Sequence, residues 1–227
     1  MQLYIGNKNY SSWSLRAWLL LTQSGIEFEE IKLRLAFEDA SNFKQTMTRI
    51  APTGCVPVLV DAGFVVWDTL AIAEYLAEQY PDKHLWPDQP QARARARSLC
   101  AEMHSGFGAL RNHCAMNIEA SLPEVGKRLI AEQPDMVRDL ERITQMWGQQ
   151  FDEHGGPFLF GAFSIPDAYF APVCSRIATY ALPVPARIAA YVDRIHALPA
   201  MQAWTRDARA EQDFVEEGEP YRTAPVR

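Results

Sequence analysis

The sequence predicts an α/β domain followed by an all-α helical domain. Three observations support this prediction: strand and helix signals alternate over residues 1–80, a proline-rich segment follows at 81–90, and only helical periodicity recurs over 91–227. The signals of the first part run βαβ and then ββα, an order that needs a mixed four-stranded sheet with an antiparallel last hairpin. We therefore expect a first domain, a linker and a helical domain with these boundaries.

The elements of the first part follow from short-range patterns. Short apolar runs predict strands at residues 3–5, 56–60 and 64–67, and the alternation over 28–33 predicts another. Asp61-Ala62-Gly63 supplies the turn of the last hairpin. Helices are predicted from Leu15 to Thr22 with Gly25 as the cap, over 39–49, and from Thr69 to a point before Pro81.

The second part shows helical spacing throughout. Helices are predicted over 92–111, over 136–151, from Ser164, over 186–197 and over 200–211. Ser164, Pro166 and Asp167 form a capping box at the start of the third of these helices. Residues 112–134 have no assignment from their pattern, and the polar tail from Glu216 is expected to be loosely held.

Composition narrows the class of protein. A net charge of −6 gives no general attraction to nucleic acid or to an anionic membrane. The four cysteines are scattered, without a C-x-x-C pair or metal-ligand spacing, so we expect a reducing compartment and no metal. The opening Met1-Gln2-Leu3-Tyr4 lacks the charged start of a signal peptide, which predicts a cytoplasmic protein without a membrane segment.

Residues 9–14, Asn-Tyr-Ser-Ser-Trp-Ser, form a polar loop before the first helix. The unpaired N–H groups and the macrodipole of a helix N-terminus favour negative charge, so Ser11 or Ser12 is well placed to stabilise a thiolate. The plainer interpretation is helix capping, which we expect of Ser12 or Ser14.

Residues 51–59, Ala-Pro-Thr-Gly-Cys-Val-Pro-Val-Leu, place a proline at the start of a strand. A proline there, above all after a cis bond, can turn the backbone of the preceding Val56 outward to pair with a bound peptide. An ordinary edge-strand proline is the alternative.

Residues 68–76, Asp-Thr-Leu-Ala-Ile-Ala-Glu-Tyr-Leu, begin a helix. The first backbone N–H groups can hold a carboxylate, and Asp68 can hold an ammonium group. Simple capping by Asp68 explains the same residues.

Together these three segments resemble the glutathione S-transferase family, and Gly161 to Ala168 is similar to that family's capping segment. The resemblance covers nearly the whole chain, looks bacterial, and in Ser11-Ser12-Trp13-Ser14 is most similar to the zeta-class S-S-C motif. It implies a thioredoxin-like first domain, glutathione as co-substrate, a small electrophilic substrate, a homodimer, no metal, and a role in detoxification.

By position, the resemblance implies that Ser11 is the catalytic hydroxyl, with Ser12 as neighbour and possible substitute. It also implies roles for six glutathione-binding residues, namely Trp13, Cys55, Val56, Pro57, Asp68 and Thr69. Val56 would bind the cysteinyl backbone beside cis-Pro57, and Asp68 with Thr69 would hold the γ-glutamyl group. Trp13 replaces the zeta-type cysteine, which disfavours zeta-type isomerase chemistry. Cys55 stands where many relatives carry a basic or polar residue, so a charge contact to glutathione is missing there. We expect Cys55 to be a buried structural cysteine and not a redox-reactive thiol.

The implied chemistry is activation of the glutathione thiol for attack on a small hydrophobic electrophile. Met103, Phe107 and Arg111, four apart on one predicted helix, are candidate walls of the electrophile site, although core packing explains the first two equally well. The alternatives are a glutathione-dependent isomerase or reductase, and a non-catalytic ligand carrier or interaction protein. A reductase generally needs a cysteine in the loop, and a carrier need not keep Ser11.

Charge adds an expectation about assembly. Glu74 and Glu78 form an acidic stripe and Arg93 and Arg97 a basic one, so two copies related by a two-fold axis could pair them.

Overall fold

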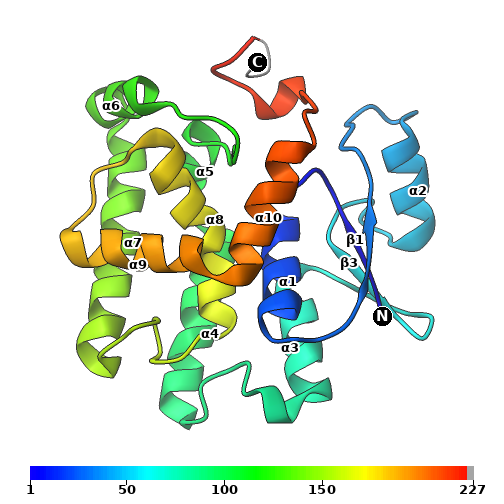
Figure 1. Ribbon diagram of the computed structural model, residues 1–227, viewed down its shortest axis with the longest axis horizontal. Helices are drawn as coiled ribbons and strands as arrows, with labels where there is room; N and C mark the ends of the chain where they lie inside the picture. Colours follow the sequence, from blue (N-terminus) through cyan, green and yellow to red (C-terminus); the bar gives the residue numbers. More distant parts are fainter. Residues whose placement is uncertain (224–227) are drawn as a thin grey trace.

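The computed structural model describes residues 1–223 and confirms a thioredoxin-like α/β part followed by a helical part (Figure 1). The first part comprises β1 (Gln2–Ile5), α1 (Ser12–Gln23), β2 (Glu29–Lys32), α2 (Asn42–Ile50), β3 (Val58–Asp61), β4 (Phe64–Trp67) and α3 (Thr69–Gln79). The second comprises η1 (Pro81–Lys83), α4 (Pro90–Ser105), α5 (Gly108–His113), α6 (Pro123–Glu132), α7 (Pro134–His154), α8 (Ile165–Tyr180), α9 (Ala186–Ala197), α10 (Pro199–Ala210) and η2 (Glu216–Gly218).

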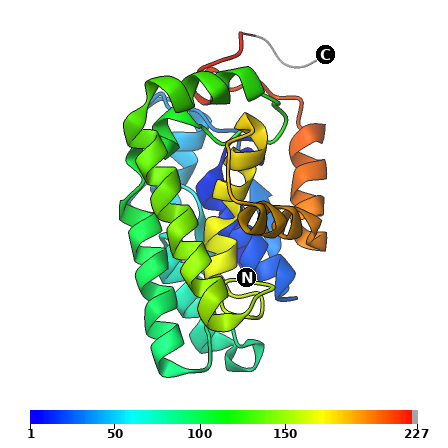
Figure 2. The same ribbon diagram turned by 90° about the vertical axis from the view of Figure 1, so that its left-hand side faces the viewer.

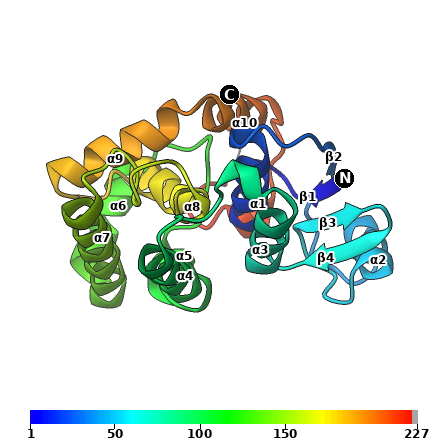
Figure 3. The same ribbon diagram turned by 90° about the horizontal axis from the view of Figure 1, so that it is seen from below.

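The sheet has the predicted mixed topology. Its strand order is β2-β1-β3-β4, with β1 parallel to β2 and antiparallel to β3, and with β3 antiparallel to β4. The β3–β4 hairpin turns through Ala62 and Gly63, whose φ angles of 47° and 88° suit a two-residue hairpin turn. Seen from below, α1 and α3 cover one face of the sheet and α2 covers the other (Figure 3).

Helix α1 joins the two parts. Its buried residues, among them Leu15 and Leu19, belong to a core that continues into the helical part, where α1 packs against α8. Helix α8 is buried along nearly its whole length, because α1, α4, α6 and α9 all contact it (Figures 2 and 3). A smaller cluster lies beneath α2 and includes Phe43, Met47 and Val58.

The long helix predicted over 92–111 is wrong, because the chain breaks at Gly106 and Phe107. A Cβ at Gly106 would lie 2.8 Å from the backbone oxygen of Glu102, and Phe107 has a φ of 57°. Met103, Phe107 and Arg111 therefore do not share one helix face. Met103 and Phe107 are buried in the main core and do not line the cleft described below.

The expectation of a loosely held tail is also wrong for the residues that the structure describes. Glu219 is buried, and its carboxylate accepts a hydrogen bond from Tyr10 of the first part of the chain. The last four residues of that tail, 224–227, lie outside the described part. The unassigned region 112–134 contains α6, which starts at Pro123.

The pairing of charge stripes between two copies stays a prediction, although one acidic and one basic member of these stripes already meet within the chain. Arg97 donates two hydrogen bonds to Glu74 of the same chain, at 2.7 and 3.0 Å, so these two charges already neutralise each other.

Over residues 1–223, the structure has no helix long and apolar enough to cross a membrane.

Candidate functional site

A cleft of about 420 Å³ collects residues from both parts of the chain. Its lining comes from the start of α1, the loop before β3, the junction of β4 with α3, and the end of α4. These residues are Trp13, Thr53, Cys55, Val56, Pro57, Trp67, Asp68, Thr69 and His104. The structure thus brings six of the eight predicted site residues together, and leaves Ser11 and Ser12 outside the lining.

The loop before β3 offers a free backbone edge. The Val56–Pro57 peptide bond is cis, as expected. Val56 precedes the ladder of β3, and within residues 1–223 its backbone forms no hydrogen bond. Its N–H and C=O are therefore available to a bound extended peptide. The neighbouring Cys55 is exposed, so the expectation of a buried structural cysteine is wrong.

Asp68 begins α3 in an unusual conformation. Its Oδ1 accepts a hydrogen bond from the Leu70 N–H at 2.8 Å, so it is the N-cap, as its position predicted. Its φ of 74° and ψ of 135° lie in a region that a residue with a Cβ rarely adopts, at a cost of about 1–3 kcal/mol. Oδ2 lies 3.3 Å from Nε2 of His104.

The side chain of Thr69 faces inward. Its Oγ1 lies 2.8 Å from the Tyr169 hydroxyl on α8, and that hydroxyl lies 2.8 Å from Nδ1 of His104. The Thr69 hydroxyl is thus engaged in a chain that runs from Asp68 through His104 and Tyr169. What Thr69 offers to a ligand is its backbone N–H in the first turn of α3.

The serines before α1 have different roles. Ser11 is the N-cap of α1: its Oγ accepts from the Ser14 N–H at 3.4 Å and donates to the Ser14 Oγ at 2.7 Å. Ser14 Oγ also accepts from the Gly6 N–H at 3.1 Å. The capping role that we expected of Ser12 or Ser14 therefore belongs to Ser11, which is 7% exposed. Ser12 is half-buried, and no hydrogen bond of its hydroxyl is formed within the described chain.

Positive charge lies behind the Trp13 wall. The guanidinium of Arg16 lies between the rings of Trp13 and Tyr169, 4.2 Å from each centroid, and its Nε donates to the Tyr169 carbonyl at 3.1 Å. Burial lowers the pKa of Arg16 to about 10, so it is still a cation at neutral pH. Arg111 lies 5.7 Å from the Trp13 ring. Two cations at this wall favour an anion in the cleft.

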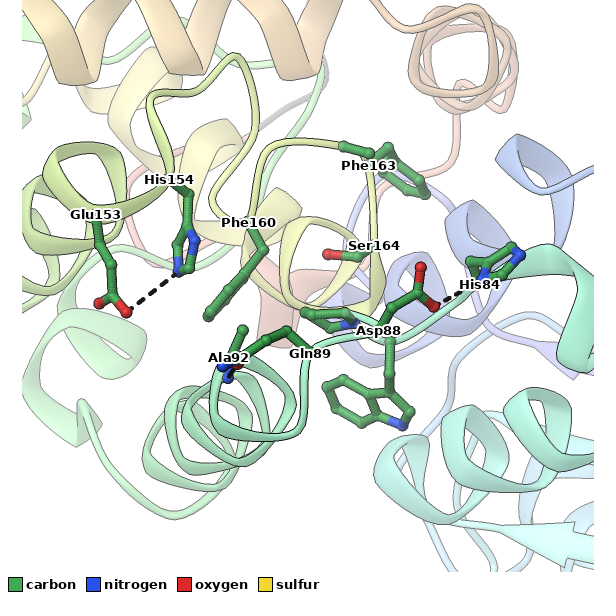
Figure 4. Close-up of a pocket in the computed structure, with 12 residues that line it drawn as sticks. His84, Asp88, Gln89, Ala92, Glu153, His154, Phe160, Phe163 and Ser164 are labelled. Carbon is green, nitrogen blue, oxygen red and sulfur yellow. Dashed lines mark hydrogen bonds and ion pairs between the residues drawn. The ribbon is translucent and has the colours of Figure 1, made fainter.

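A second cavity, of about 440 Å³, lies between the segment after η1, the start of α4 and the loop before α8 (Figure 4). His84 pairs with Asp88 on one side of it, and His154 lies beside Glu153 on the other. None of the eight predicted residues lines this cavity. The cleft at Asp68 is therefore the candidate site.

Sequence reasoning missed His104, Tyr169 and Arg16. Each lies inside a helix without a motif of its own, and only the docking of α4 and α8 against α1 and α3 brings them to the site. Trp67 could have been proposed from the sequence, because tryptophan is enriched at binding interfaces and Trp67 directly precedes Asp68.

Residues 10–79 match the family model described as the glutathione S-transferase N-terminal domain. A glutathione transferase homologue from a Burkholderia, solved with bound glutathione, aligns at a TM-score of 0.63 and 28% identity over 92% of this chain and 97% of its own. This chain belongs to the glutathione S-transferase family. The fold of the chain, an α/β part beside a bundle of helices, is seen in Figure 1.

Two curated relatives align at 26% and 36% identity over different lengths of the chain. A stringent starvation protein A homolog of Coxiella burnetii is 26% identical over 83% of this chain and 81% of its own. A probable maleylacetoacetate isomerase of Caenorhabditis elegans is 36% identical over 110 residues, or 48% of this chain and 49% of its own. The alignment with that isomerase thus covers about half of either chain.

Proposed function

We propose that this protein binds glutathione in the cleft at Asp68 and activates its thiol for attack on a small hydrophobic electrophile. The observation that supports the proposal most strongly is that three predicted segments meet in one cleft. Three segments, represented by Trp13, Val56-Pro57 and Asp68-Thr69, are far apart in the sequence but line one cleft. Each offers a group that a different part of glutathione needs.

The backbone of Val56 would pair with the cysteinyl residue of glutathione as a strand would. The first N–H groups of α3 would hold the γ-glutamyl carboxylate, and Asp68 would hold the α-ammonium. Trp13 and Cys55 would form the walls beside the thiol. In this proposal the boundaries 1–80, 81–90 and 91–227 separate the glutathione domain, the linker and the domain that completes the electrophile site.

Activation of the thiol would come from Ser11 or Ser12. A free thiol has a pKa of about 8.5, so that only about 3% is thiolate at pH 7; lowering that pKa by about two units takes about 2.7 kcal/mol. A thiolate is a stronger acceptor than a hydroxyl, and a hydroxyl hydrogen turns freely. The Ser11 hydroxyl would therefore turn from Ser14 to the thiolate, and Ser14 would donate to Ser11 in its place. The cations at Arg16 and Arg111 would favour the same charge.

The test is a pair of single substitutions, Ser11→Ala and Ser12→Ala, assayed with glutathione and a panel of electrophiles. We expect Ser11→Ala to lower turnover at least about tenfold with little change in glutathione affinity measured by calorimetry. A larger effect of Ser12→Ala would transfer the role to Ser12, whose hydroxyl is free. Full activity of both variants would exclude hydroxyl activation.

Two other functions have support. The likeness to a maleylacetoacetate isomerase favours glutathione-dependent isomerisation, for which Trp13 in place of cysteine is the objection. The engagement of Ser11 as a cap favours a glutathione-fold carrier or interaction protein without turnover. Measured turnover with any electrophile separates the carrier from the enzymes, and turnover of a cis-alkene diacid without loss of free thiol identifies the isomerase.

We further propose a homodimer that acts in the cytoplasm in detoxification. Support for the dimer comes from an apolar groove along β4 and α3, which includes Phe64, Trp67, Leu70 and Tyr75. Phe64 is 61% exposed and Trp67 is 42% exposed, which is unusual for such large side chains.

A further inference from the structure

The tail after α10 passes over the loop that leads into Ser11. We call residues 211–222 the C-terminal strap and residues 7–10 the Ser11 loop. In Figure 1 the strap, drawn in red, continues from the top of α10 at the same end of the molecule as this loop. We propose, on the basis of the function proposed above, that Glu219 of the strap is a positioning residue, which holds the Ser11 loop in place through Tyr10.

The central contact joins Glu219 to the residue before Ser11. The Tyr10 hydroxyl donates to Glu219 Oε1 at 2.6 Å and also lies 3.2 Å from the Asp213 carbonyl. The side chain of Glu219 is only 1% exposed. Burial, reinforced by the hydrogen bond to Glu219, raises the pKa of Tyr10 to about 12, so the phenol is a donor at all physiological pH values.

Glu219 is itself fixed from the helical part. Its Oε2 accepts from Asn117 Nδ2 at 2.8 Å and from Arg222 Nε at 2.7 Å, and Oε1 also accepts from Arg222. Burial acts to raise the pKa of Glu219, but the hydrogen bonds from Arg222, Tyr10 and Asn117 outweigh it, and the pKa lies below its ordinary value. Glu219 is therefore a carboxylate, and it ties Tyr10 to Asn117 of the helical part and to Arg222 of the strap itself.

The strap holds the other end of the Ser11 loop as well. Glu211 accepts from the backbone N–H groups of Lys8 and Asn9, at 2.8 and 3.3 Å. Asn7 Nδ2 donates to Asp213 at 3.0 Å. Three of the four loop residues thus bond to carboxylates at positions 211 and 213, and the fourth, Tyr10, bonds to Glu219.

Packing links the strap to both sides of the proposed thiol site. Val215 is buried in the cluster beneath α2, against which Tyr10 and Val56 also pack. A Cβ on Gly218 would lie 2.7 Å from the Tyr10 ring, so the strap lies directly on that ring. Ser11 N bonds to the Asn7 carbonyl at 2.8 Å and Ser12 N to the Tyr10 carbonyl at 2.9 Å, so a shift of the loop moves both serines.

This arrangement points to positioning because the contacts converge on the loop that leads into Ser11 and Ser12, whose backbone N–H groups bond to that loop. Catalytic groups need placement within fractions of an ångström, and supporting residues outside the site provide it. A loosened Tyr10 would leave the fold and the Asp68 end of the cleft intact but would misplace the Ser11 hydroxyl relative to the thiol.

The test compares Glu219→Gln and Tyr10→Phe with a matched control, Glu217→Gln, at an exposed residue of the same strap. We expect both test variants to lower kcat about fivefold or more with glutathione KM within about twofold of wild type, while the control matches wild type. The pKa of the bound glutathione thiol, read from thiolate absorbance against pH, should rise in the test variants alone. The double variant should lose no more activity than Glu219→Gln, because one contact carries the effect.

Amide hydrogen exchange over residues 7–15 provides a readout that does not need turnover. Faster exchange there in Glu219→Gln and Tyr10→Phe, with unchanged exchange in α7, is expected. If wild type has no glutathione turnover, the proposed function fails, and the exchange rates still decide whether Glu219 holds the loop. Unchanged exchange, or an unchanged kcat and thiol pKa in an active enzyme, would overturn the assignment. Tyr10→Phe removes one oxygen only and covers the case in which Glu219→Gln does not fold.

Discussion

His104 Nε2 lies 3.3 Å from Asp68 Oδ2, so an imidazole of the helical part contacts the carboxylate that caps α3. The other imidazole nitrogen lies 2.8 Å from the Tyr169 hydroxyl. Because Asp68 Oδ1 is held by the Leu70 N–H, both carboxyl oxygens are fixed and the group has one orientation toward the cleft.

Asp68→Ala should raise the glutathione KM more than it lowers turnover at saturation. The proposed contact is to the α-ammonium, at the end of glutathione remote from the thiol, so its loss weakens binding of the ground state and the transition state alike. Steady-state kinetics with varied glutathione measures both parameters. Wild-type KM in this variant would reduce Asp68 to a helix cap.

His104→Phe should raise the glutathione KM about threefold, and this effect should vanish when Asp68 is already alanine. Phenylalanine keeps a ring against Trp13, whose ring centroid lies 5.1 Å from that of His104, but it removes both nitrogen contacts. The carboxylate of Asp68 would then lose its fixed orientation. A double-mutant cycle on KM measures the coupling, and additive effects would show that His104 acts independently of Asp68.

Asp167 should make the fold less stable as pH rises from about 4 to about 6. Burial raises its pKa to about 6 although donors at Leu159, Tyr191 and Ser164 act to lower it, whereas in the unfolded chain it keeps its ordinary value of 3.8. Below both values each state holds the proton; between them only the folded state does, so the free energy of unfolding falls with pH by about 3 kcal/mol across the window. Well above pH 6 both states have lost the proton, so Asp167 no longer makes the free energy of unfolding depend on pH.

Asp167→Asn is the control for that prediction, because it removes the titration. Denaturant unfolding at a series of pH values should show the fall in wild type relative to the variant. At neutral pH the variant should itself be less stable by about 2 kcal/mol, since it replaces a carboxylate oxygen that accepts the Ser164 N–H. A wild-type advantage that grows between pH 4 and 6 would mean that the four hydrogen bonds that Asp167 accepts, two of them from Ser164, outweigh burial.

Features that are set by residues close together in the sequence were predicted well. The β3–β4 turn, the cap at Asp68 and the capping box at Ser164 were predicted because each is set by neighbouring residues. The break at Gly106 was missed because helical spacing continues through it, although a glycine beside Ser105 is a common helix end.

Long-range contacts could not be predicted in the same way. His104 and Tyr169 reach the cleft only because α4 and α8 dock beside α1 and α3. The tail from Glu216 was expected to be loose because its residues are polar, yet the carboxylate of Glu219 finds a donor about 200 residues earlier, at Tyr10. A polar composition predicts exposure only where no buried donors are available to pair with it.

Phe64→Asp should convert the proposed dimer into a monomer, while Phe37→Asp should leave it intact. Both side chains are exposed aromatics, at 61% and 52%, but only Phe64 lies on the apolar groove along β4 and α3. A carboxylate buried in an apolar interface without a partner costs several kcal/mol, enough to disrupt a dimer at micromolar concentration. Light scattering should give about twice 25.7 kDa for wild type and Phe37→Asp, and 25.7 kDa for Phe64→Asp.

The same variant should also bind glutathione more weakly, because Trp67 and Asp68 border both the groove and the cleft. A partner over the groove would cover the outer wall of the glutathione site and limit the solvent around Asp68. The glutathione KM of Phe64→Asp should therefore rise toward that of Asp68→Ala, whereas Phe37→Asp should keep the wild-type value. A monomeric wild type would refute the dimer. A monomeric Phe64→Asp with an unchanged glutathione KM would show that glutathione binding in the cleft does not depend on a partner over the groove.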